Sequence, residues 1–148
     1  MTSLSSGRLG LGLLFAATAL MGCMTTDKHD DLGQVCLGDV EAWDTGVDLV
    51  IEPGDSPAVT VIFSTCTSGS VDWSDQSCLI EVSDGEIHVT TYARTRTPRG
   101  AQTDDCNWVS WDCGSVDLEE GEYTLVYGSG EESFAVPYQG NSICAQNG

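Results

Sequence analysis

Hydrophobic and polar positions alternate over short runs in most of this 148-residue chain, which is the pattern of β-strands. Residues 47–51 (VDLVI) end at a Glu-Pro-Gly-Asp turn signal. Residues 58–64 (AVTVIFS) are β-branched and apolar enough to predict a buried strand, and residues 108–111 predict a short one. Because we find no convincing helical period over three turns, the pattern predicts an all-β protein.

Two pairs of alternating runs predict β-hairpins. Residues 78–82 and 86–92 flank an Asp84-Gly85 pair, which is a strong short-range hairpin signal. Residues 122–127 place aromatic and aliphatic side chains on one face, and a Gly-Ser-Gly turn joins them to residues 131–136. These local sequence signals therefore predict at least two antiparallel strand pairs.

Short strands at this spacing, with turn signals between them, predict one antiparallel β-sandwich domain over residues 34–148. Residues 67–76 and 97–105 are expected to be loops. The run 121–127 (GEYTLVY) resembles the penultimate strand of immunoglobulin-like and fibronectin-like modules, and this resemblance implies that kind of sandwich architecture. We find no Cys…Trp…Cys pattern of a true immunoglobulin domain.

The amino-terminal segment has a different pattern. A short polar stretch with one cation, Arg8, precedes an apolar run over residues 9–20, and Met21 and Gly22 follow. This is the layout of a secretory signal peptide, and the run is shorter than the about 20 apolar residues that a transmembrane helix needs. Cleavage near Ala19 or Gly22 would release a soluble protein.

The sequence Leu20-Met21-Gly22-Cys23 resembles the lipobox of bacterial lipoprotein precursors. The resemblance implies that residues 1–22 are a lipoprotein signal peptide and that Cys23 receives a diacylglyceryl group and an acyl chain such as palmitate. Two or three acyl chains anchor a protein stably. Residue 24 is Met and not the Asp of an inner-membrane retention signal, so the resemblance implies the outer membrane of the cell envelope. The polar residues 23–33 are expected to form a flexible tether.

The acidic charge of the chain argues against two kinds of partner surface. The sequence contains 5 Lys and Arg residues and 23 Asp and Glu residues, and loss of Arg8 with the signal peptide leaves a formal charge of −19. Such a domain repels nucleic acid and anionic lipid surfaces. The membrane, reached through the lipid on Cys23, and an envelope protein remain as expected partners.

Seven Cys residues leave an even number when Cys23 is set aside. Six Cys in an exported domain indicate disulfide bonds, although they allow 15 pairings. Proximity in sequence favours Cys66–Cys78 and Cys106–Cys113, which leaves Cys36–Cys144 to join the two ends of the domain. Since no C-x-x-C spacing and no D-x-D-x-D-G loop occurs, we predict no metal site and no cofactor.

The sequence provides little for catalysis. His88 is the single His of the predicted domain, and strand alternation places it on the solvent face with Glu86 and Thr90. No G-x-S-x-G nucleophile motif is present. We therefore predict a non-enzymatic binding or structural module, and an exported hydrolase with an unrecognised active site is the alternative.

Three Trp and three Arg residues mark a candidate binding surface in the segments 67–76 and 97–113 and in the strand before them. They are Trp73, Trp108, Trp111, Arg94, Arg96 and Arg99. Exposed Trp suits sugar stacking or a protein interface, and clustered Arg suits an anion or an acidic partner. The alternatives are filling of the core by Trp and local balancing of an acidic surface by Arg.

Overall fold

The computed structural model describes residues 24–38, 47–100 and 103–148, with the side chains of residues 64–66 excepted. In this part of the chain there are eleven β-strands and no helix, so no helix of a length and apolarity that could cross a membrane is found there. The strands are β1 (Met24–Asp30), β2 (Gln34–Leu37), β3 (Leu49–Ile51), β4 (Ala58–Thr67), β5 (Asp72–Ser83), β6 (Glu86–Pro98), β7 (Asn107–Ser115), β8 (Gly121–Tyr127), β9 (Gly130–Val136), β10 (Tyr138–Gly140) and β11 (Ile143–Gln146).

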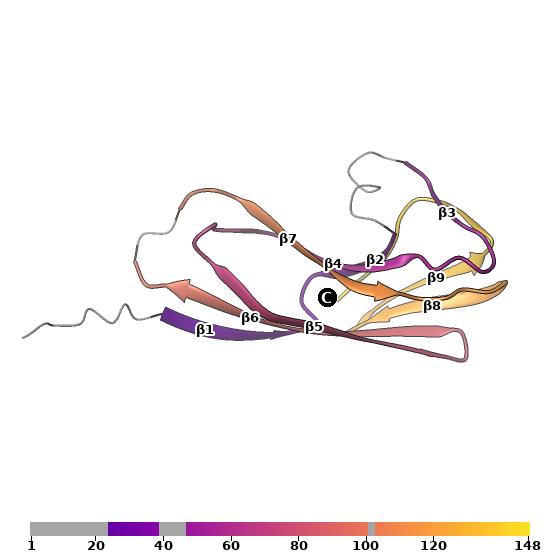
Figure 1. The fold of residues 1–148 in the computed structure, drawn as a ribbon, viewed down its shortest axis with the longest axis horizontal. Helices are drawn as coiled ribbons and strands as arrows, with labels where there is room; N and C mark the ends of the chain where they lie inside the picture. The colour runs from indigo at the N-terminus through magenta and orange to yellow at the C-terminus, as the bar shows by residue number, and fades with distance from the viewer. Residues whose placement is uncertain (1–23, 39–46, 101–102) are drawn as a thin grey trace, which may run out of the picture.

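Two sheets form a sandwich, and the long strand β6 is the centre of the first one (Figure 1). One edge of β6 pairs with β5. The other edge is shared, because β8 pairs in parallel with residues 86–89 and β1 pairs antiparallel with residues 92–98. Strand β9 extends this sheet beyond β8, while the second sheet has the order β11-β2-β4-β7 and a small ribbon pairs β10 with β3.

The core lies between the two sheets. Val35, Leu37 and Val61 enter it from the second sheet, and Ile87 and Leu125 enter from the first, all fully buried. Alternation sets this arrangement, since the inward positions of β6 are buried while most of the outward ones are exposed. Each such side chain contributes about 1.5–3 kcal/mol on burial, which makes this layer the main source of stability.

The local predictions are confirmed where they rest on turns and on β-branched runs. Strand β4 covers the predicted buried strand, and β5–β6 and β8–β9 are the two predicted hairpins. Asp84 and Gly85 both have positive φ, 53° and 82°, which is the backbone that an Asp-Gly hairpin turn requires. An all-β sandwich is therefore the observed architecture.

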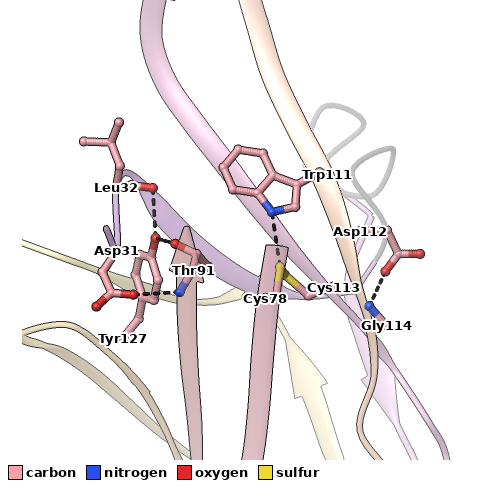
Figure 2. Close-up of a disulfide and its surroundings, with 9 residues drawn as sticks. All are labelled: Asp31, Leu32, Cys78, Thr91, Trp111, Asp112, Cys113, Gly114 and Tyr127. Atoms are coloured by element: carbon pink, nitrogen blue, oxygen red, sulfur yellow. Dashed lines mark hydrogen bonds between the residues drawn. A yellow bond between two sulfur atoms is a disulfide. The ribbon is translucent and has the colours of Figure 1, made fainter. Parts of the chain in front are cut away.

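The crossing from β1 to β2 joins the two sheets through buried and partly buried hydrogen bonds (Figure 2). The hydroxyl of Tyr127, which is fully buried, donates to the carbonyl of Leu32 at 2.9 Å and lies 2.8 Å from the Thr91 hydroxyl. The Thr91 N–H donates to a carboxylate oxygen of Asp31 at 2.7 Å. Asn147 near the carboxyl end donates to the Asp31 carbonyl at 2.8 Å, so this junction ties four parts of the chain together.

The predicted flexible tether is wrong for residues 24–30, because they form β1. Every residue from Met24 to Asp30 has a partner on β6, from Pro98 back to Tyr92. The strand is exposed on nearly all positions, so it carries no hydrophobic period. What holds it is backbone pairing with the part of the β6 edge that β8 does not reach. Cys23 lies outside the described residues.

The disulfides confirm one predicted pair and correct two. Cys36 bonds to Cys144 on the neighbouring strands β2 and β11, where the two residues are direct partners with Cα atoms 4.1 Å apart. Cys78 bonds to Cys113, so the predicted pairs Cys66–Cys78 and Cys106–Cys113 are wrong. The reason is that β5 and β7 lie in opposite sheets and face each other across the core, which proximity in sequence cannot reveal.

Candidate binding surfaces at the two ends of the domain

Two of the three candidate Trp residues point into the sandwich and not into solvent. Trp73 belongs to β5 and not to a loop, and its ring centroid lies 5.0 Å from that of Phe63 and 6.3 Å from that of Trp111. The imidazole ring of His29 stacks on Trp73 at 5.8 Å. These rings fill the space between β1, β5 and the second sheet, which corrects their placement on a binding surface in favour of core filling.

Trp111 also covers the disulfide that joins the sheets. Its indole N–H donates to Sγ of Cys78 at 3.2 Å, as Figure 2 shows. Positions 109, 111 and 113 of β7 are partly buried while their neighbours are exposed, so Trp111 and Cys113 share the inward face. By contrast Trp108 is 73% exposed, and of the three candidates it alone remains a surface residue.

Two of the three candidate Arg residues lie on the outer face of the first sheet, and the third, Arg99, is exposed just after β6. Arg94 and Arg96 alternate with the buried Ala93 and Thr95 on β6. The Arg94 guanidinium donates to the Tyr92 hydroxyl at 3.2 Å and forms an ion pair with Asp75 at 3.0 Å. The hydrogen bond to Tyr92 and the negative charge of Asp75 both raise the pKa of Arg94. The structure therefore separates the Arg side chains from Trp73 and Trp111, which lie on the opposite face of the same sheet or in the other sheet.

The two loop segments predicted to share a site do meet. The Ser68 hydroxyl donates to the Thr103 carbonyl at 2.9 Å, and the Gly69 N–H donates to the Asp105 carboxylate at 3.1 Å. Hydrogen bonding from the Thr103 side chain and the Gly69 N–H holds the pKa of the Asp105 carboxyl below its usual value. With the end of β6 and the starts of β1 and β7, these loops form one end of the elongated molecule (Figure 1). We call it the β1 end.

The opposite end contains a shallow groove that sequence reasoning did not predict. It has a volume of about 510 Å³ between the β5–β6 turn and strands β8 and β9. Its lining includes Asp84, Glu86, Glu122, Tyr123 and Phe134. The groove exists because β8 pairs in parallel with the start of β6, with Glu86 opposite Thr124. No local signal in the sequence indicates that long-range pairing.

His88 lies on the exposed face of β6, as alternation predicts, where its Nε2 atom is 2.8 Å from a Glu86 carboxylate oxygen. It is not part of the groove lining. Within the described ranges, no group of three or more His, Cys, Asp or Glu side chains is arranged to hold a metal ion. The groove can offer carboxylates and two aromatic rings to a cationic or sugar-like ligand.

Comparison with a collection of protein-family models, with curated proteins and with solved structures found no significant match to this chain.

Proposed function

We propose that this protein is a lipoprotein of the bacterial cell envelope, anchored by acyl chains on Cys23 in the outer membrane. Its domain is a non-enzymatic binding or structural module. The lipobox-like sequence Leu20-Met21-Gly22-Cys23 is the basis of the anchor. The Cys follows the small residue Gly22 at the end of the signal-like segment, which is the position that is lipidated in lipoprotein precursors.

The disulfide bonds support the proposal that the domain is exported. Cys36, Cys78, Cys106, Cys113 and Cys144 are all disulfide-bonded. Disulfides persist in oxidising compartments and are rare in the cytosol. An exported, disulfide-bonded domain that follows a lipobox-like sequence is the combination expected of an envelope lipoprotein.

The finer architecture that we propose is immunoglobulin-like or fibronectin-like. A disulfide that joins the two sheets, with a Trp packed against it, is a feature of immunoglobulin domains. Here the Cys78–Cys113 bond and the indole of Trp111 provide that combination. The parallel pairing of β6 with β8 is an addition to the antiparallel pairs of the sheets.

The binding or structural role is supported by the position of the His residues and by the acidic groove. A hydrolase of the Ser-His-Asp kind would need a His, but His88 pairs with Glu86 outside the groove lining and His29 stacks on Trp73. The groove presents Glu86 and Glu122 beside aromatic rings, which suits recognition of a ligand through charge and stacking.

The anchor is tested by fractionation of cells that express Cys23→Ala, with Met24→Ala as the matched control. We expect wild type and Met24→Ala in the membrane fraction and Cys23→Ala in the soluble envelope fraction or unprocessed. A processed Cys23→Ala protein that still fractionates with membranes would contradict the anchor.

A further inference from the structure

If Cys23 is lipidated as proposed above, the lipid is attached one residue before the first strand of the domain. Strand β1 begins at Met24, and consecutive Cα atoms are about 3.8 Å apart. Met24 pairs with Pro98 at the end of β6, so both strand ends lie next to the anchored residue. The β1 end of the molecule is then held at the surface of the membrane that contains the acyl chains.

Trp108 lies at the same end of the molecule. It is the second residue of β7, and the first one, Asn107, pairs with Thr67 at the end of β4. The Asn107 side chain donates to the Asp105 carboxylate at 3.2 Å, and the Gly69 N–H donates to the same carboxylate. The start of β7 is therefore fixed to the loops of the β1 end, and Figure 1 shows it at the same end of the molecule as the start of β1.

Trp108 and Met24 present large apolar side chains to the surroundings of this end. The Trp108 side chain is 73% exposed and that of Met24 is 53% exposed. Positions 109, 111 and 113 of β7 face inward, so Trp108 projects from the outer surface of the second sheet. Since Trp73 and Trp111 pack inside the sandwich, Trp108 alone among the Trp residues that the structure describes offers its indole to a partner.

The charged side chains of the β1 end do not select an anionic surface. Asp72 lies directly opposite Arg96, and Asp75 forms an ion pair with Arg94. The other charged residues there are Asp27, Lys28, Asp30, Arg99, Asp104 and Asp105. Because acids outnumber cations, electrostatics provide no attraction to anionic lipids, and a contact with the membrane depends on the apolar side chains.

The indole ring is suited to the boundary between water and hydrocarbon. Its surface is apolar while its N–H donates a hydrogen bond, and Trp is therefore enriched at membrane interfaces. Acyl chains on Cys23 would keep the domain next to the bilayer at a high effective concentration. Trp108 can then enter the interface even though a single indole has too little affinity to recruit a free protein.

On the basis of the anchor proposed for Cys23, we propose that Trp108 and Met24 insert into the headgroup region of a zwitterionic bilayer. The lipid interface is the occupant of this surface, because the chain runs from this end directly to Cys23 and the apolar segment before it. Met24 belongs to the first sheet and Trp108 to the second, so both sheets contact the membrane. The acidic groove lies at the other end of β6, about 40 Å away along its 13 residues, and faces away from the bilayer.

Quenching of Trp fluorescence by brominated lipid measures this contact. The full lipidated protein is reconstituted in vesicles of phosphatidylcholine, either unmodified or brominated on acyl carbons close to the headgroup. We expect the quenched part of the emission to fall about twofold or more in Trp108→Phe, because Trp73 and Trp111 lie inside the domain. Addition of phosphatidylglycerol should not increase the quenching, and a clear increase would contradict a contact made by apolar side chains.

The double variant Trp108→Phe/Leu79→Trp is the matched control, because it moves the exposed indole away from the β1 end. Leu79 is 56% exposed on β5, and its partner Thr90 lies eight residues before Pro98, about 27 Å along β6. We expect the indole at position 79 to be quenched by acrylamide in water and not by the brominated lipid. Equal lipid quenching of wild type and Trp108→Phe, or equal lipid quenching of indoles at positions 79 and 108, would overturn the membrane contact. Failure of the wild-type protein to float with the vesicles would instead contradict the anchor.

Discussion

The hydroxyl of Tyr127 provides a quantitative test of how the two sheets are joined. Tyr127→Phe removes one oxygen atom and leaves the fully buried ring in place. The Leu32 carbonyl then loses its donor at 2.9 Å and the Thr91 hydroxyl loses its neighbour at 2.8 Å. Leaving a buried polar group unpaired costs about 1–3 kcal/mol, so we expect a loss of about 2 kcal/mol in the free energy of unfolding at pH 8.

The same substitution should change how stability depends on pH. Burial, partly offset by the Thr91 hydrogen bond, raises the pKa of Tyr127 to about 12. An unfolded Tyr has a pKa of about 10, so the unfolded state releases its proton first as pH rises, and stability falls between pH 10 and 12. At pH 11 the wild type has lost about 1.4 kcal/mol through this group, whereas the Phe variant has nothing to lose there.

Urea unfolding of both proteins at pH 8 and pH 11, with the disulfides intact, measures this difference. We expect the advantage of the wild type to shrink by about 1.4 kcal/mol between the two pH values. Tyr123→Phe is the control, because its hydroxyl bonds the backbone of Glu119 in an exposed position and should cost less. An advantage that is absent at pH 8, or that is constant with pH, would refute the buried junction.

Three further predictions concern the turn, the disulfides and β1. Gly85→Ala should cost more than Gly54→Ala: both glycines have positive φ, but a Cβ at Gly85 lies 2.9 Å from the Glu122 carbonyl oxygen while one at Gly54 meets nothing within 4 Å. Thermal unfolding should therefore show that both variants lose about 1–2 kcal/mol of stability because of the positive φ, and that Gly85→Ala loses more. Equal losses would contradict the contact with the Glu122 carbonyl. Non-reducing peptide mapping should recover the Cys78–Cys113 link. This bond spans 35 residues, so the chain-entropy model gives a loss of about 4 kcal/mol in stability when it is removed. The same model gives about 5 kcal/mol for the Cys36–Cys144 bond, which spans 108 residues. Recovery of a Cys106–Cys113 peptide would restore the pairing favoured by proximity. Hydrogen exchange should show protected amides in residues 25–30, whereas free exchange there would restore the flexible tether.

The elements that the sequence predicts correctly are those specified locally. The Asp84-Gly85 turn and the alternation of β6 need no knowledge of distant residues, because turn chemistry and side-chain period determine them. Strand β4 was likewise predictable from its β-branched run. Such strands can be predicted because burial on one or both faces gives them a recognisable hydrophobic pattern.

Other features depend on which strands become neighbours, and no local pattern carries that information. Strand β1 is exposed along most of its length and is fixed by backbone pairing, so its polar composition is typical of a linker and does not predict a strand. The Cys78–Cys113 bond follows from two strands facing each other across the core. Exchange of β8 for β1 along one edge of β6 creates the acidic groove at one end of that strand and the pairing site of β1 at the other.

The candidate surface shows the same division. The three Arg residues were predicted as surface residues, and on β6 Arg94 and Arg96 do alternate with buried positions. The sequence could not assign Trp73 and Trp111 to the interior, because an aromatic side chain between polar neighbours suits either a core or an interface. Their burial became evident only through the contacts with Phe63 and Cys78.

The mass of the amino-terminal peptide of the protein purified from membranes tests the anchor on Cys23. We expect a mature chain that begins at Cys23, with a diacylglyceryl group on its sulfur and an acyl chain on its amino group. A mature chain that begins at another residue, or a Cys23 that carries no lipid, would contradict it.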